Sequence, residues 1–229
     1  MVFYCRDIES GKLGKEESIH CSRVLRAKVD QEITLFDGKG RVAIGILTSI
    51  GKHCEYEIIS EETYKPENNH FTIAIAPPKK STRFDFMIEK LVELGAQEIY
   101  LIQTKNSERN RINKERLYKQ VVAACKQSLQ FLLPTIHFEK SIKELEHINK
   151  QFYVCHCVDA TKKASLKSLK LEDYRNGIFF IGPEGDFNLD EIEYFKTRGA
   201  QFIDLGEARL RTETAAIYVA ASAKQSVNT

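Results

Sequence analysis

The feature that most constrains the fold is a change of sequence pattern near residue 70. Before it lie short alternating apolar and polar runs, two of which flank the hairpin signal Asp37–Gly40. From residue 71 onward, buried-strand runs alternate with segments of helical periodicity. Strands alternating with helices favour a mostly parallel sheet covered on both faces. We therefore predict a β-rich domain over 1–67 and an α/β domain over 71–229, with a polar linker at 61–70.

Capping patterns mark several helix starts in the second domain. A Ser or Asn that precedes an apolar periodic run can accept a hydrogen bond from the first free amides of a helix. The expected starts are Ser81 (helix to Leu94), Asn113 (helix to about Leu132), Ser141 with Glu144, Asn188 with Glu191, and a last helix from about Thr212.

Composition excludes several classes of protein. The net charge is only +2, with 42% apolar and 29% charged residues, which is ordinary for a soluble globular chain. No apolar run approaches the roughly 20 residues of a membrane helix, and the first residues do not resemble a signal peptide. The six cysteines form no CxxC pair. We expect a cytoplasmic protein with reduced thiols and no membrane partner.

Cys155-His156-Cys157 is the one stretch that could suggest a metal site. It lies in an alternating, strand-like run, in which neighbouring side chains point to opposite faces. Zinc sites usually have wider spacing and a second ligand pair. We expect no metal there.

Two glycine-containing loops follow predicted strands near the C-terminus. The first reads Ile181-Gly182-Pro183-Glu184-Gly185, and the second runs from Leu205 to Ala216. In open parallel sheets, ligands bind beyond the carboxyl ends of the strands. Glycine lets a backbone approach a ligand closely, and no phosphate-binding GxxxxGK[ST] or GxGxxG pattern is present. Either loop alone could be a tight turn, but the two together favour a small-ligand site that uses backbone groups.

Basic residues are concentrated in the central segment, 71–126. They include Lys79, Lys80, Arg83, Lys105, Arg109, Arg111, Lys114, Arg116 and Lys119. Such a concentration is either a phosphate-backbone contact or a solvated helix face.

The two loops together resemble the paired C-terminal motifs of a known family. "IGPEGDF" with "LGEARLRTETA" is similar to the motifs of the RsmE-type small-subunit ribosomal RNA uridine-N3 methyltransferases, members of the SPOUT superfamily. The segments "HCSRVLR" (20–26), "LFDGKG" (35–40), "EKLVELG" (89–95) and "KQSLQFLLPTI" (126–136) extend the resemblance over nearly the whole chain.

The resemblance implies a fold and a cofactor. It predicts an N-terminal PUA-like, RNA-binding β-barrel and a C-terminal SPOUT domain with a deep trefoil knot, acting as a homodimer. The cofactor would be S-adenosylmethionine, and the substrate small-subunit ribosomal RNA or the assembled small subunit. The residues matching the family's cofactor pocket are Ile181, Gly182, Pro183, Glu184, Gly185, Leu205, Gly206, Leu210, Arg211 and Thr212.

The implied chemistry needs a cation and a base. Uridine N3 must lose its proton to become a good nucleophile. Arg211 is the candidate for stabilising the developing uridine anion, and Glu184 and Glu213 are candidates for the base or for orienting Arg211. The structural alternatives are a Glu184–Arg211 ion pair and, for Glu213, an acid in the first turn of a helix. Candidate RNA contacts are His20, Arg23, Arg26, Lys79, Lys80 and Arg83.

The chain also departs from the family pattern. Many members have a second glycine where this chain has Asp186, and an arginine at the position of Ala208, next to Arg209. An arginine common in the family is Gln130 here. Two other functions therefore remain as alternatives. One is a catalytically inactive RNA-binding module of the same fold, and the other is a small-molecule α/β enzyme, disfavoured because no acidic metal cluster is evident.

Overall fold

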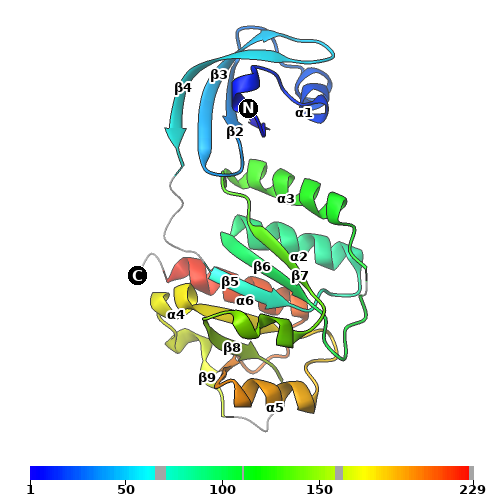
Figure 1. Cartoon of the computed structure of the whole chain (residues 1–229), viewed down its shortest axis with the longest axis vertical. Coiled ribbons are helices and arrows are strands. Elements are labelled where there is room, and N and C mark those ends of the chain that lie inside the picture. The colour runs from blue at the N-terminus through cyan, green and yellow to red at the C-terminus, as the bar shows by residue number, and fades with distance from the viewer. Residues whose placement is uncertain (65–70, 110, 158–161, 227–229) are drawn as a thin grey trace. The chain divides into compact units, whose positions relative to one another are not determined.

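The computed structural model describes residues 1–64, 71–109, 111–157 and 162–226 (Figure 1). Spatial contacts divide the chain into two compact units, Met1–Pro66 with Cys125–Leu133, and Glu67–Ala124 with Pro134–Thr229. Residues 125–133, which the sequence analysis assigns to the α/β domain, therefore belong by their contacts to the N-terminal unit.

The N-terminal unit is built on a four-stranded sheet. Its strands are β1 (Val2–Tyr4), β2 (Glu32–Phe36), β3 (Arg41–Ser49) and β4 (Glu55–Thr63), and its helical segments are η1 (Ile8–Ser10), α1 (Lys15–Ile19) and η2 (His20–Val24). The order is β1-β2-β3-β4, with β1 parallel to β2 and the other pairs antiparallel. The predicted hairpin at Asp37–Gly40 is confirmed as the β2–β3 connection. Among the described residues no pairing joins β1 to β4, so strand pairing leaves the predicted β-barrel open between these two strands.

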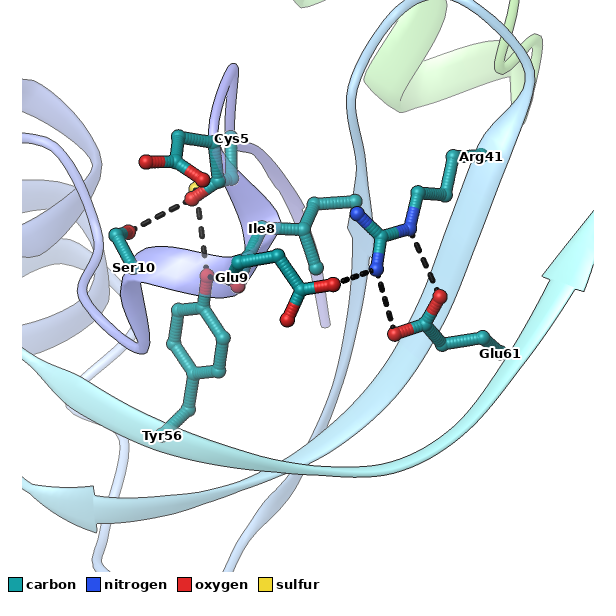
Figure 2. Close-up of polar contacts among 8 residues, drawn as sticks. Cys5, Ile8, Glu9, Ser10, Arg41, Tyr56 and Glu61 are labelled. Atoms are coloured by element: carbon teal, nitrogen blue, oxygen red, sulfur yellow. Dashed lines mark hydrogen bonds and ion pairs between the residues drawn. The ribbon is translucent and has the colours of Figure 1, made fainter.

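Polar contacts hold the η1 turn against this sheet (Figure 2). The Tyr56 hydroxyl donates to the carbonyl oxygen of Ile8 at 2.8 Å. Arg41 donates to both carboxylate oxygens of Glu61, at 2.8 and 2.7 Å, and also contacts Glu9 of η1. The buried tyrosine anchors one side of the turn, and the bidentate guanidinium joins it to β3 and β4.

The segment after α3 completes the N-terminal unit. Leu132 forms bridges to Gly38 and Lys39, and the Leu133 amide donates to the Gly38 carbonyl at 3.0 Å. The Phe131 ring lies 5.4 Å from Phe36.

Two further contacts extend this packing. The Phe131 ring lies 5.2 Å from Tyr64, edge to face. Lys126 places its ammonium 2.8 and 2.7 Å from the Glu17 carboxylate oxygens, and both side chains are largely buried. We infer that residues 1–67 alone would leave apolar surface of this unit uncovered.

Replacing Phe131 with alanine should therefore destabilise the N-terminal unit. We expect the free energy of unfolding to fall by about 2 kcal/mol, below the full-core cost because the ring is only half-buried. Urea unfolding followed by tyrosine fluorescence measures it. Leu129→Ala is the matched control, because Leu129 is 55% exposed. Equal losses in the two variants would contradict the packing role of Phe131.

The C-terminal unit is an α/β fold around a seven-stranded parallel sheet. Its strands are β5 (Phe71–Ile75), β6 (Ala96–Ile102), β7 (Thr135–Glu139), β8 (Gln151–Cys155), β9 (Ala164–Ser165), β10 (Gly177–Ile181) and β11 (Gln201–Asp204). The order is β7-β6-β5-β10-β8-β11-β9, and every pair is parallel. Its helical segments are α2 (Ser81–Glu93), α3 (Lys114–Ser128), η3 (Ile142–His147), η4 (Leu166–Ser168), α4 (Leu171–Asn176), α5 (Leu189–Thr197) and α6 (Thr212–Gln225).

Both faces of the central strands are buried, as the sequence predicts. In β10, Phe180 packs with Phe195 of α5 on one face, at 4.8 Å between ring centroids. Its neighbour Phe179 stacks on Tyr174 of α4 on the other face, at 5.1 Å. Successive residues of a strand point to opposite faces, so helices must cover both.

The capping predictions have mixed outcomes. The Asn188–Glu191 box is confirmed, with reciprocal hydrogen bonds of 2.9 and 2.8 Å, and Asn113 accepts from the Arg116 amide. Ser81 is the first residue of α2, which Lys80 precedes as N-cap. The Ser141–Glu144 prediction is confirmed in position only, because Ser141 is the N-cap of a 3₁₀ helix but its side chain makes no capping hydrogen bond. That segment is the 3₁₀ turn η3, and the Glu144 carboxylate accepts instead from the Lys140 amide.

Two boundaries also differ from the predictions, and among the described residues the elements β7, β9 and α4 were not predicted. The helix expected to reach about Leu132 ends at Ser128, because Leu129 turns into the left-handed region at φ 56°. The stretch 61–70 begins within β4, which extends to Thr63, while 65–70 lie outside the described residues.

Candidate functional site

The carboxyl ends of β5, β10, β8 and β11 meet at one edge of the sheet because all four strands are parallel. The predicted ligand loops follow β10 and β11. In the sheet these two strands are not neighbours, since β8 lies between them. Three strand ends therefore surround the place where the sequence analysis expected two.

A cavity of about 710 Å³ lies at this edge. Its volume is within the range typical of small-molecule sites, roughly 300–1,000 Å³. It is lined by Cys155, His156, Cys157, Lys163, Ile181, Gly182, Pro183, Glu184, Asp186, Asp204, Leu205, Gly206, Glu207, Ala208, Arg209, Leu210, Arg211, Thr212 and Ala215.

The structure brings together almost all of the residues predicted to bind the cofactor. Every one of them lines the cavity except Gly185. Gly185 is exposed, and an added Cβ there would stand 3.1 Å from the Cβ of Asn106. The glycine at 185 thus serves loop packing.

A buried hydrogen bond joins the two predicted loops. The Thr212 hydroxyl, in the first turn of α6, donates to the Gly182 carbonyl oxygen at 3.0 Å. Gly206 in the second loop has φ 115°, and an added Cβ there would meet no atom within 4 Å. One loop is therefore fixed to α6, and the other presents open backbone.

Glu184 is held by the loop that follows β5. Its Oε1 accepts from the Lys79 amide at 3.1 Å, while Oε2 is buried without a hydrogen-bond partner among the described residues. Arg109 fixes that loop in turn, donating to the carbonyl oxygens of Pro78 at 2.8 Å and Lys79 at 2.7 Å. Sequence reasoning missed this role of Arg109, since nothing local to it indicates the contact.

The catalytic candidates Arg211 and Glu213 have different environments. Arg211 is exposed and lines the cavity. Among the described residues its side chain has no hydrogen bond or ion pair, so the Glu184–Arg211 pair is not formed. Glu213 is only 7% exposed, outside the cavity lining, and its Oε1 lies 3.5 Å from Arg83 Nε. Its Oε2 has no hydrogen-bond partner in the described structure.

The end of β8 supplies site residues that sequence reasoning did not assign. Cys155, His156 and Cys157 all line the cavity. Burial raises the pKa of the Cys155 thiol, and the nearby Asp186 carboxylate raises it further, so this thiol stays protonated. The available signal was that β8 is a buried parallel strand, whose carboxyl end must reach the same edge as β10.

The candidate RNA contacts lie in both units. In the N-terminal unit Arg23 and Arg26 are exposed, whereas His20 is half-buried with its ring edge-on to Phe3 at 6.4 Å. In the C-terminal unit Lys79, Lys80 and Arg83 surround the start of α2.

The pairing of these cations differs. Lys80 is exposed, Lys79 pairs with Glu108, and Arg83 pairs with Glu213. Gln130, a departure from the family pattern, accepts from the Tyr64 hydroxyl at 3.1 Å within the N-terminal unit.

The described residues offer neither a metal site nor a membrane-spanning helix. They contain no group of three or more His, Cys, Asp and Glu side chains arranged to hold a metal ion. No helix in the described part of the chain combines the length and apolar character needed to cross a bilayer.

Family models match both units. The model of an RNA methyltransferase domain matches residues 65–224, which includes the whole cavity, and that of an RNA methyltransferase PUA domain matches 13–55. The chain belongs to the RNA methyltransferase family. The N-terminal sheet is accordingly PUA-like, and the resemblance drawn from the two loops is confirmed.

Individual relatives agree with this family. A ribosomal RNA small subunit methyltransferase E of Rickettsia conorii is 28% identical over 90% of this chain and 86% of its own. A probable rRNA-methyltransferase structure from Porphyromonas gingivalis is 33% identical with a TM-score of 0.86, covering 96% of this RNA methyltransferase and 94% of that chain. A ribosomal RNA small subunit methyltransferase E from Neisseria gonorrhoeae, bound to S-adenosyl methionine, is 28% identical with a TM-score of 0.78, covering 96% and 94%.

Proposed function

We propose that this chain methylates N3 of a uridine in small-subunit ribosomal RNA, with S-adenosylmethionine as the methyl donor. The observation that carries the proposal is the convergence of the two motif loops on one cavity, where Thr212 binds Gly182 directly. Relatives named as small-subunit ribosomal RNA methyltransferases support the substrate, and the cofactor-bound Neisseria relative supports the methyl donor.

The cavity residues fit this cofactor. Bare backbone at Gly206 can approach the edge of a planar base, because an added Cβ there would meet no atom within 4 Å. We assign cofactor binding to the predicted residues that line the cavity, which are Ile181–Glu184, Leu205, Gly206, Leu210 and Thr212, with Arg211 contributing its backbone. Gly185 instead serves the packing of the first loop. When bound, S-adenosylmethionine supplies an electrophilic methyl carbon on a sulfonium leaving group.

The reaction requires side chains that accept one proton and stabilise one developing negative charge. N3 of uridine gives up its proton as the methyl carbon bonds to it, and negative charge spreads to the ring oxygens. Arg211 is our candidate for the stabilising cation, because its side chain lines the cavity and has no hydrogen bond or ion pair to the described residues. Glu184 is favoured over Glu213 as the base, because Glu184 lines the cavity and Glu213 does not. In this proposal Glu213 does not contact the substrate, and its role is to hold the side chain of Arg83, its ion-pair partner.

RNA must present an unpaired target, since N3 lies on the Watson–Crick edge. Phosphate contacts by Arg23 and Arg26, and by Lys79, Lys80 and Arg83, would give affinity that falls with salt. His20 is the weakest of the proposed contacts because its ring packs on Phe3.

We also propose, on the family resemblance, a deep trefoil knot, a homodimer and a cytoplasmic location. The domains would divide near residues 67–71. The alanines of α6 do not by themselves support the dimer, because Ala215, Ala216, Ala220 and Ala223 are buried in a helix that packs on α2, β5 and β10 of the same chain. The α6 residues that we propose for contact with a second subunit are the exposed Ala221 and the half-buried Ile217 and Tyr218.

The proposal is tested in two steps with the full-length protein. Calorimetric titration with S-adenosylmethionine, with and without small-subunit particles, should give saturable binding. Particles from a strain lacking this gene are then incubated with protein and cofactor, and their nucleosides are analysed by mass spectrometry. We expect 3-methyluridine to appear. A different methylated nucleoside would refute the N3 assignment, and a folded protein without binding or methylation would favour the inactive RNA-binding module.

A further inference from the structure

Asp186 has an unusual backbone conformation for a residue with a side chain. Its φ is 62°, in the left-handed region, where glycine is favoured and aspartate is tolerated at some cost. Its amide donates to the Pro183 carbonyl at 2.9 Å, which closes the turn of the first motif. A glycine would form the same turn without strain, so the aspartate side chain must contribute something else.

The Asp186 carboxylate joins two strand ends. Oδ2 accepts from the Cys157 amide at 2.7 Å, and Oδ1 accepts from the Phe187 amide at 2.8 Å. Cys157 follows β8, and Phe187 lies in the loop that follows β10, the neighbouring strand. Hydrogen bonds to a carboxylate are stronger than those between neutral groups. One side chain therefore holds together two walls of the cavity.

A third loop supports the same turn from outside. The Asn106 side-chain amide donates to the carbonyl oxygens of Gly185 at 3.1 Å and Asp186 at 2.9 Å. Asn106 lies in the loop after β6. The backbone of the turn is thus fixed by Asn106, and the Asp186 side chain is left directed toward the end of β8.

We propose that Asp186 is a positioning residue, which clamps the end of β8 to the loop after β10 and so preassembles the ligand cavity. A ligand then binds without having to order Cys157, and avoiding that ordering increases affinity. The identity of the ligand as S-adenosylmethionine rests on the proposed function, whereas the clamp itself does not.

Two substitutions separate the hydrogen bonds from the backbone strain. Asp186→Gly removes both carboxylate bonds and also relieves the left-handed strain. Asp186→Asn keeps the size and the tolerance of positive φ but retains only one acceptor oxygen, so one of the two amides loses its partner. Asp190→Asn is the matched control, because Asp190 is exposed in the first turn of α5 and its substitution makes the same change of charge.

Hydrogen exchange of the Cys157 amide, measured in the ligand-free protein, tests the clamp. We expect exchange about tenfold faster in Asp186→Gly, a smaller increase in Asp186→Asn, and none in Asp190→Asn. Unchanged exchange in Asp186→Gly would refute the clamp, whether or not the wild-type protein binds S-adenosylmethionine.

Calorimetric affinity for S-adenosylmethionine tests the positioning role. We expect about tenfold weaker binding by Asp186→Gly and an intermediate value for Asp186→Asn. Faster Cys157 exchange with wild-type affinity would overturn positioning and leave only a structural bond. A wild-type protein that binds no S-adenosylmethionine would count against the proposed function, and the exchange result would still decide the clamp.

Discussion

Replacing Arg211 with alanine is expected to lower kcat for RNA methylation by about 10²–10³-fold, the usual cost of removing one group that stabilises a developing oxyanion. The Kd for S-adenosylmethionine should change by no more than a few-fold. Arg211 is exposed, lines the cavity and precedes the first turn of α6, whose N-terminal partial charge has the same sign. Single-turnover methylation of small-subunit particles, alongside calorimetry, measures both quantities.

Two companion variants sharpen this expectation. Arg211→Lys keeps the positive charge but loses the planar, multi-donor guanidinium, so its kcat should fall between those of wild type and Arg211→Ala. Arg209→Ala is the matched control, because Arg209 is also an exposed arginine that lines the cavity. A Kd that rises as much as kcat falls in Arg211→Ala would show that Arg211 binds cofactor rather than assisting the chemistry.

The site was predictable where one strand and its loop carry the information. A buried strand that runs into Gly182-Pro183, and another that runs into Leu205-Gly206, identify two loops at the carboxyl edge of a parallel sheet. Their residues do line one cavity. The Asn188–Glu191 helix start was equally predictable, because both partners of the capping box lie within one turn.

The site was not predictable where contacts join distant parts of the chain. The buried-strand pattern of β8 indicates that its end reaches the carboxyl edge of the sheet, but its position between β10 and β11, which brings Cys155–Cys157 to the cavity, is set by the packing of the whole sheet. Asp186 could be recognised as a departure from the family pattern. Its bond to the Cys157 amide, across 29 positions, could not.

The same distinction explains the fold errors. Helical periodicity predicts that α3 continues to about Leu132. In the structure, Leu132 and Leu133 instead pair with the turn at Gly38 of the N-terminal unit, and the helix ends before Leu129. Tertiary contacts override a local helical preference of this size. The Ser141–Glu144 pattern located the start of η3, but the reciprocal box did not form, since the Glu144 carboxylate accepts from the Lys140 amide.

The substitution Gly182→Trp should weaken S-adenosylmethionine binding by more than about a hundredfold, or about 2.7 kcal/mol. Gly182 is buried and lines the cavity, and its carbonyl oxygen accepts a hydrogen bond from the Thr212 hydroxyl. An added Cβ would already stand 3.2 Å from Asp186 Oδ1 and 3.3 Å from the Phe187 ring. The rest of an indole would have to displace these neighbours or enter the cavity that Gly182 lines, and either change disturbs the ligand site.

Controls separate a filled cavity from a misfolded protein. Gly14→Trp adds the same side chain where a Cβ meets nothing within 4 Å, and it should bind S-adenosylmethionine as the wild type does. Gly182→Ala introduces only the close contacts to Asp186 and Phe187, so its affinity should fall less than that of the tryptophan variant. Thermal unfolding of all three establishes that each is folded. If a folded Gly182→Trp protein kept wild-type affinity, the cofactor would have to bind elsewhere, and the assignment of both motif loops to it would fail together, because Thr212 links them at this residue.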